Sequence, residues 1–182
     1  LRDAGEQPCT DRWAERYDAW RDFLDAAGVA AIGMGLVALW RTDSADPVQV
    51  LEDVPQALEQ PIGATLPQWI SRQRRLAACS DAELLHAVLQ PGPGVVRTRD
   101  ELLTPGGWQP DADRLRQTTG MRWDVEVDDA IAALLAGLDG TVTLLAPLSV
   151  LAGALDITVD DVVAAALPVV RDLVGRGFLE WT

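Results

Sequence analysis

The chain has 182 residues, of which 48% are hydrophobic and 24% are charged, so it holds enough apolar material for a sizeable core and is not disordered as a whole. Its 28 acidic residues outnumber the 15 basic ones, and the net charge of −13 repels phosphate backbones, which excludes nucleic-acid binding without a local basic patch. All of these basic residues are Arg, because neither Lys nor Asn occurs, and this bias is typical of a GC-rich bacterial genome.

Residues 1–58 are the first of three predicted regions. Thr10 or Asp11 can cap an amphipathic helix that ends at Gly28. The apolar stripe of this helix consists of Trp13, Tyr17, Trp20 and Leu24. Val29–Trp40 is apolar on both faces, which predicts an interior strand, and Val48–Leu51 predicts a short strand that pairs with it. An interior strand needs a larger sheet, and the chain does not begin with Met, so we expect a C-terminal piece of a bigger protein.

Residues 59–127 are predicted to combine helices with a small antiparallel sheet. The first helix of this region carries Trp69. Ser80 and Glu83 have the spacing of a capping box, which predicts a second, short helix over Asp81–Leu89. Short β-branched runs between Gly-rich turns then predict the sheet within Val95–Val127.

The first helix of this middle region also contains the one compact basic cluster of the sequence. The cluster consists of Trp69, Arg72, Arg74 and Arg75. Planar guanidinium groups bind phosphate in a bidentate way, and an aromatic ring can stack on a base, so the cluster is a candidate contact for an anion, RNA or substrate. The competing interpretation is a solvated helix face beside acidic neighbours.

Residues 128–182 predict three helices followed by a strand. The predicted helices are Ala130–Leu138, Leu144–Ala154 and a long helix from Thr158 to Arg176, and the strand is Phe178–Trp181. This order is typical of a winged helix-turn-helix unit whose second wing strand is missing. The whole chain is therefore predicted to be an α+β protein.

Two features of the long third helix shape its expected role. Asp160 and Asp161 lie at its start, where they would face phosphates, so a protein-interaction or packing role is favoured over DNA binding. Pro168 lies inside the helix and predicts a kink or a split near Leu167.

We assign no catalytic, cofactor-binding or metal-binding residue from the sequence. His86 is the one histidine, and we expect it to be structural and partly buried. Cys9 and Cys79 belong to no metal-binding motif; the reduced state is favoured, although the spacing leaves a disulfide open. Gly33 and Gly35 formally fit a dinucleotide fingerprint, but the strand predicted after them argues against it. The apolar runs are too short or too interrupted to span a bilayer, so we expect a cytoplasmic protein.

Three segments of the chain carry a resemblance to a known family. The first begins at Trp20 and reads W-x2-FLDAAGVAAIGMGLVAL. The other two lie in the C-terminal third and read LAGLDGTVTLLAPLSVLAGALD and ALPVVRDLVGRGFL. These segments resemble the C-terminal region of class I S-adenosylmethionine-dependent methyltransferases from high-GC bacteria, in which a Rossmann-like catalytic domain comes first.

The resemblance implies methyltransferase activity and S-adenosylmethionine binding for a parent protein. Neither the cofactor-binding glycine loop nor the Asn-Pro-Pro-Tyr motif of that family is found in this sequence, so no functional residue can be carried over. The chain is then expected to be a non-catalytic accessory region that positions substrate, packs against its own N-terminal catalytic domain or forms a homodimer. The alternative is an independent winged-helix module that binds a protein or, less favoured, nucleic acid; a self-contained enzyme is the least favoured.

Overall fold

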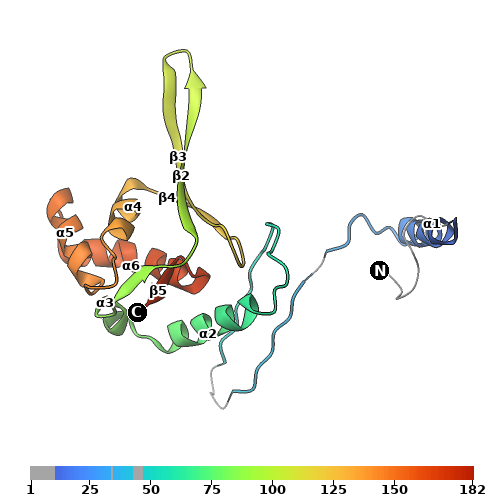
Figure 1. The fold of residues 1–182 in the computed structure, drawn as a ribbon, viewed down its shortest axis with the longest axis horizontal. Helices are drawn as coiled ribbons and strands as arrows, with labels where there is room; N and C mark the ends of the chain where they lie inside the picture. The colour runs from blue at the N-terminus through green and yellow to red at the C-terminus, as the bar shows by residue number, and fades with distance from the viewer. Residues whose placement is uncertain (1–10, 34, 43–46) are drawn as a thin grey trace. The chain divides into compact units, whose positions relative to one another are not determined.

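The structure is a computed structural model, and it describes residues 11–33, 35–42 and 47–182. By its internal contacts the chain divides into two compact units, Leu1–Pro47 and Val48–Thr182 (Figure 1). The predicted division into residues 1–58, 59–127 and 128–182 stays a prediction. The helices and small antiparallel sheets confirm the α+β class. Within the described residues, no helix combines the length and the apolar character that crossing a membrane requires.

The N-terminal unit contains helix α1 (Asp11–Ala26), as predicted. Gly28 follows it with a φ of +67°, in the left-handed region where glycine ends helices without strain. The rings of Trp13 and Tyr17 stack with centroids 5.4 Å apart, and Trp20 meets Phe23 edge-on at 5.9 Å. These aromatic side chains pack on one another along the helix, and no residue of α1 is buried.

The strand predicted over Val29–Trp40 is wrong for the described part of this segment, which forms neither strand nor helix. Its described Val, Ile and Leu side chains are exposed, and the exposed fraction reaches 84% at Val37 and 91% at Leu39. A strand forms only where a neighbouring strand accepts its backbone hydrogen bonds, and the described residues do not provide that neighbour. The prediction of a strand over Val48–Leu51 is wrong for the same reason.

The second unit begins with helices α2 (Thr65–Ala78) and α3 (Asp81–Leu85). The capping box is confirmed: Ser80 Oγ accepts a hydrogen bond from the Glu83 amide at 3.3 Å, and Glu83 Oε2 accepts one from the Ser80 amide at 2.8 Å. Helix α3 is shorter than predicted, because the chain enters strand β1 (Leu89–Pro91) soon after it.

The predicted antiparallel sheet is confirmed as three strands in the order β2–β3–β4. They are β2 (Val95–Thr104), β3 (Gly107–Gln117) and β4 (Asp124–Val127). Strand β4 pairs with β3 only at the base of the β2–β3 hairpin. The outer half of the hairpin extends away from the helices (Figure 1). A register shift between Asp100 and Glu101 marks the point where the outer half begins.

Three helices and a strand follow in the predicted order. They are α4 (Asp129–Ala136), α5 (Leu145–Leu155), α6 (Val159–Arg176) and β5 (Leu179–Trp181). Helix α6 runs through Pro168 without a break, so the predicted split is wrong. Leu167 and Val170 are buried on either side of the proline, and their packing holds both halves of the helix on the core.

The edge strand of the predicted winged helix finds a partner from earlier in the chain. Strand β5 pairs antiparallel with β1, with Leu89 opposite Trp181 and Pro91 opposite Leu179. Val88 forms a further antiparallel bridge with Thr143, which lies between α4 and α5. A segment of the middle region thus lies between two segments of the C-terminal region.

One hydrophobic core joins the predicted middle and C-terminal regions. Its members come from α3, β1, β3, β4, all three C-terminal helices and β5. The largest fully buried side chains are Phe178, Leu84, Leu89, Leu134, Leu138, Leu144, Leu148, Leu173, Leu179, Val170 and Val174. Because strand and helix residues far apart in sequence share this core, we expect the second unit to unfold as one.

Candidate functional site

The structure places the predicted basic cluster on helix α2, beside the end of α6 and strand β5. Arg72 is largely buried and packs on the backbone of Gly177: a Cβ atom at that glycine would lie 2.8 Å from the guanidinium carbon. Arg72 Nη1 lies 3.6 Å from Glu180 Oε1, and its Nε is buried without a hydrogen-bond partner in the described structure. Burial lowers the pKa of Arg72, and the carboxylate of Glu180 acts in the opposite direction.

The other members of the cluster divide between packing and solvent. The guanidinium of Arg75 lies over the Trp181 ring, 4.2 Å from its centroid, a distance at which cation–π attraction operates. Trp69 is half-buried, with a buried indole N–H that lacks a partner in the described structure. Arg74 is exposed.

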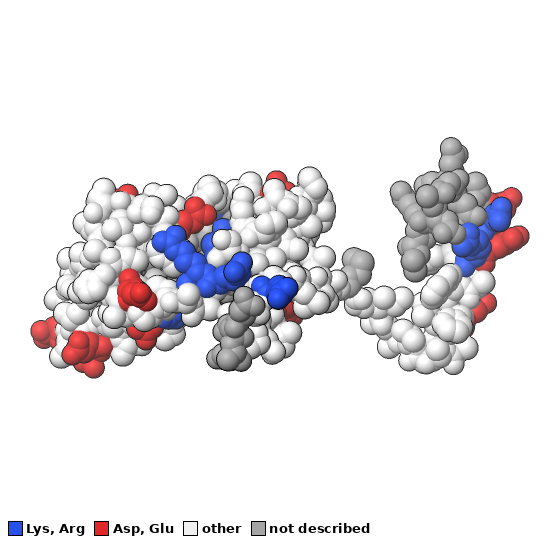
Figure 2. Space-filling view, turned by 90° about the horizontal axis from the view of Figure 1, so that it is seen from below, with Lys and Arg blue, Asp and Glu red and all other residues white. Residues whose placement is uncertain are grey.

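Two adjoining hollows lie between α2 and β5. The smaller has a volume of about 180 Å³ and is lined by Ser71, Arg72, Arg75, Glu180 and Trp181. The larger, of about 550 Å³, shares Arg75 and Trp181 with it and extends toward α3. The structure therefore brings together Arg72 and Arg75, while Trp69 and Arg74 do not line either hollow. In the face seen from below, Arg side chains gather along one stretch of the larger body (Figure 2).

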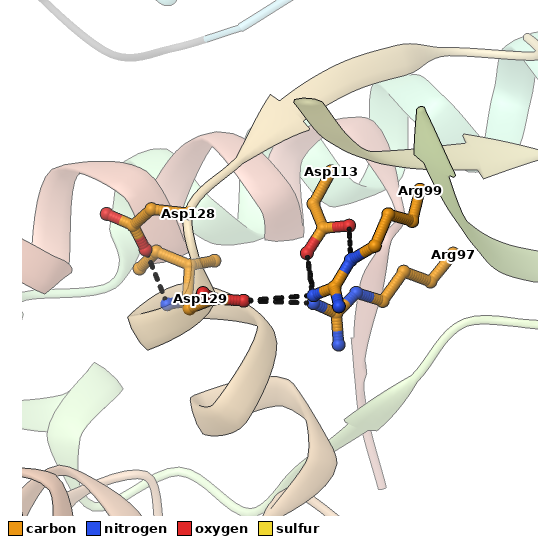
Figure 3. Close-up of polar contacts among 6 residues, drawn as sticks. Arg97, Arg99, Asp113, Asp128 and Asp129 are labelled. Atoms are coloured by element: carbon orange, nitrogen blue, oxygen red, sulfur yellow. Dashed lines mark hydrogen bonds and ion pairs between the residues drawn. The ribbon is translucent and has the colours of Figure 1, made fainter. Parts of the chain in front are cut away.

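A second charged cluster, which sequence reasoning missed, joins the β2–β3 hairpin to the start of α4 (Figure 3). Arg99 binds Asp113 in a bidentate way, with Nε–Oδ1 and Nη2–Oδ2 distances of 2.9 Å. Arg97 also donates to Asp113 Oδ2, and both arginines donate to Asp129 Oδ1 at 3.2 Å. The neighbouring Asp128 caps α4 by accepting a hydrogen bond from the Ile131 amide at 2.7 Å.

This cluster fixes the charge of its members. Hydrogen bonds from Arg99 and then Arg97 hold the pKa of Asp113 far below its usual range, and the same contact with Asp113 raises the pKa of Arg99. The signal in the sequence is that Arg97 and Arg99 are two residues apart, a spacing that places both side chains on the same face of a strand. Their acidic partner is identified only by the strand register, which places Arg99 directly opposite Asp113.

Other arginines of the second unit are also bound to carboxylates. Arg171 donates to Asp81 Oδ1 at 2.6 and 2.9 Å and to the carbonyl of Cys79 at 2.7 Å, which ties α6 to the loop before α3. Arg176 pairs with Asp172 at 2.8 Å, and Arg114 pairs with Asp124 at 2.7 Å. The contacts of Arg171 and Arg114 connect different elements, whereas the contact of Arg176 with Asp172 lies within α6.

The remaining reactive side chains do not extend the site. His86 is exposed at the end of α3, so the expectation of a partly buried histidine is wrong; the helix ends at Leu85 and turns His86 outward. Cys79 is a free thiol, and Cys9 lies outside the described residues. Among residues 11–33, 35–42 and 47–182, no three His, Cys, Asp or Glu side chains are grouped as a metal site.

Comparison with known proteins defines the family of the chain. Residues 67–181 match the family described as "Domain of unknown function (DUF7782)", and the chain belongs to this family. The match extends from the start of α2 to the end of β5 and so includes both charged clusters. No curated protein matches the sequence.

Proposed function

We propose that the chain is a non-catalytic accessory region of an S-adenosylmethionine-dependent methyltransferase, which packs against its own catalytic domain and helps to position substrate or to form a dimer. The segment resemblances given above support this proposal at the level of sequence. In this account, the chain contributes packing and binding surfaces, and the catalytic domain binds the cofactor.

The exposed apolar segment of the N-terminal unit carries the proposal. Ile32, Leu36, Val37 and Leu39 are each at least 60% exposed. Burial of a large aliphatic side chain contributes about 1.5–3 kcal/mol, so such a run favours association with another apolar surface. A segment that is apolar on both faces suits a strand position in the sheet of a Rossmann-like domain, where both faces are covered.

The arrangement of charges in the second unit agrees with a packing role. Its arginines mostly bind carboxylates of the same unit, as Arg99 does with Asp113 and Arg171 with Asp81. A nucleic-acid surface would instead need guanidinium groups directed to phosphates. The internal pairing therefore favours a protein-packing module.

The reading frame upstream of the chain gives the first test. We expect a strand–GxGxG–helix block followed by Asn-Pro-Pro-Tyr, and a frame that encodes neither would contradict the proposal. The second test is calorimetric titration of the chain with that separately purified domain. Val37→Asp and Leu39→Asp should each weaken binding by about tenfold or more, because a carboxylate would have to be desolvated.

A matched variant separates this proposal from the alternative of an independent winged-helix-like interaction module. A specific observation favours that alternative: Val150 on α5 is exposed, as are Leu155, Ile157 and Val159 at the turn between α5 and α6. Val150→Asp should leave binding to the catalytic domain unchanged. If Val150→Asp abolishes binding while Val37→Asp does not, the chain binds through α5, and residues 29–40 do not carry the interaction.

A further inference from the structure

The tip of the β2–β3 hairpin displays large apolar side chains beside a hydrogen-bonded turn. Leu102 is 58% exposed, and Leu103 and Trp108 are each 64% exposed. Thr104 Oγ1 donates a hydrogen bond to the Gly107 carbonyl at 2.8 Å and accepts one from the Gly106 amide at 3.2 Å. These bonds hold the turn between the two strands, so the apolar side chains are presented on an ordered support.

Leu103 and Trp108 stand side by side on one face of the hairpin. They are directly opposite each other in the register, as are Thr104 and Gly107 at the turn. Side chains alternate along a strand, so Leu103 shares its face of β2 with Arg99, which binds Asp113 at the base. The same face of the hairpin therefore carries ion pairs at its base and exposed apolar side chains at its tip.

The charges near the tip are acidic. Asp100, Glu101 and Asp111 are exposed and lie between the apolar tip and the base. The arginines of β2 lie closer to the base, where they bind Asp113 and Asp129. The outer half of the hairpin therefore presents an apolar end flanked by carboxylates.

We propose that this hairpin tip is a docking element for a protein segment that offers an apolar face rimmed by Lys and Arg side chains, as a basic amphipathic helix does. An ordered Trp–Leu pair is the kind of anchor that dominates binding energy at interfaces, and the carboxylates beside it complement a basic rim. A second copy of the chain, with its own charge of −13, would be repelled, as would nucleic acid or an anionic membrane. This inference is independent of the methyltransferase proposal.

The test uses the full chain and a synthetic amphipathic helix of Leu and Lys as the probe, with a Leu and Glu helix as its counterpart. The Trp108 indole N–H resonance, assigned by its loss in Trp108→Phe, should shift on addition of the Leu and Lys helix. Trp108→Ala and Leu103→Ala should each weaken binding by about tenfold or more. Leu51→Ala removes an exposed leucine away from the hairpin and should change affinity by less than about twofold.

The charge component is tested by a double variant, Asp100→Asn with Glu101→Gln, which should weaken binding and reduce its dependence on salt. Circular dichroism confirms that each variant is folded. Equal affinity of wild type and Trp108→Ala, or equal binding of the two helices, would overturn the proposal. A Trp108-dependent self-association, or Trp108-dependent binding of duplex DNA or anionic vesicles, would overturn it as well.

Discussion

Replacement of Leu89 by Ala tests whether the β1–β5 pair belongs to the same cooperative core as the C-terminal helices. Leu89 is fully buried, lies opposite Trp181 and belongs to the same core cluster as Phe178. Truncation of a fully buried leucine lowers the free energy of unfolding by about 2.7–5 kcal/mol, since it removes apolar contacts and leaves a cavity. For a urea m-value of about 2 kcal/mol/M, we expect the midpoint to fall by about 1.4–2.5 M.

The assay is urea unfolding at pH 7, followed in parallel by near-ultraviolet circular dichroism and by Trp fluorescence. The shared core predicts that both signals report one transition for the second unit, and that Leu89→Ala moves all of it. Leu102→Ala, at an exposed position of the hairpin tip, should change the free energy of unfolding by less than about 0.5 kcal/mol. Two separate transitions for residues 48–182, with only one displaced by Leu89→Ala, would refute a single core.

Two further predictions concern charge and backbone conformation. The folded state lowers the pKa of Asp113, so this carboxylate stabilises the fold above about pH 4 and loses that contribution as the pH falls. Asp113→Asn should therefore lower the urea midpoint at pH 7, and its difference from wild type should narrow below about pH 4. A difference that does not change with pH would refute this account. Gly177 has a φ of +84°, so Gly177→Ala should cost at least about 1–2 kcal/mol and displace Arg72. In thermal melts, Gly153→Ala on the open side of α5 should instead stabilise by about 0.5–1 kcal/mol, and equal effects of the two substitutions would contradict the backbone argument.

The parts of the fold that sequence predicted well depend on residues close together in the chain. Ser80 and Glu83 are three residues apart, and Thr158 caps α6 through the amide of Asp161 at 3.2 Å. Gly177 ends the same helix at the predicted residue. Such signals need only the local backbone, so they can be recognised without knowledge of tertiary contacts.

The parts that sequence did not predict depend on partners far away in the chain. The pairing of Leu89 with Trp181 joins residues separated by most of the second unit, and no periodic pattern encodes that register. The apolar character of Val29–Trp40 predicts burial, but the sequence pattern does not identify a surface that would cover it. In the structure, the described Val, Ile and Leu side chains of this segment are exposed.

The candidate site shows the same contrast between what local sequence predicts and what distant contacts decide. Sequence reasoning found Arg72 and Arg75 because they cluster on one helix, but their contacts with Glu180 and Trp181 arise from the C-terminal strand. For Arg72, this contact and its packing on Gly177 give a structural role. The anion-contact hypothesis for Trp69, Arg72, Arg74 and Arg75 stays a prediction, concentrated on the hollow that Arg72 and Arg75 share.

Hydrogen–deuterium exchange over residues 29–40 tests the accessory-region proposal most directly. The comparison is between the isolated chain and the same chain joined to the catalytic domain that the proposal requires. If this segment packs in the sheet of a catalytic domain, its amide exchange should slow by at least about 100-fold in the longer protein. Equal exchange rates in the two proteins would contradict the proposal that these residues join the chain to a methyltransferase domain.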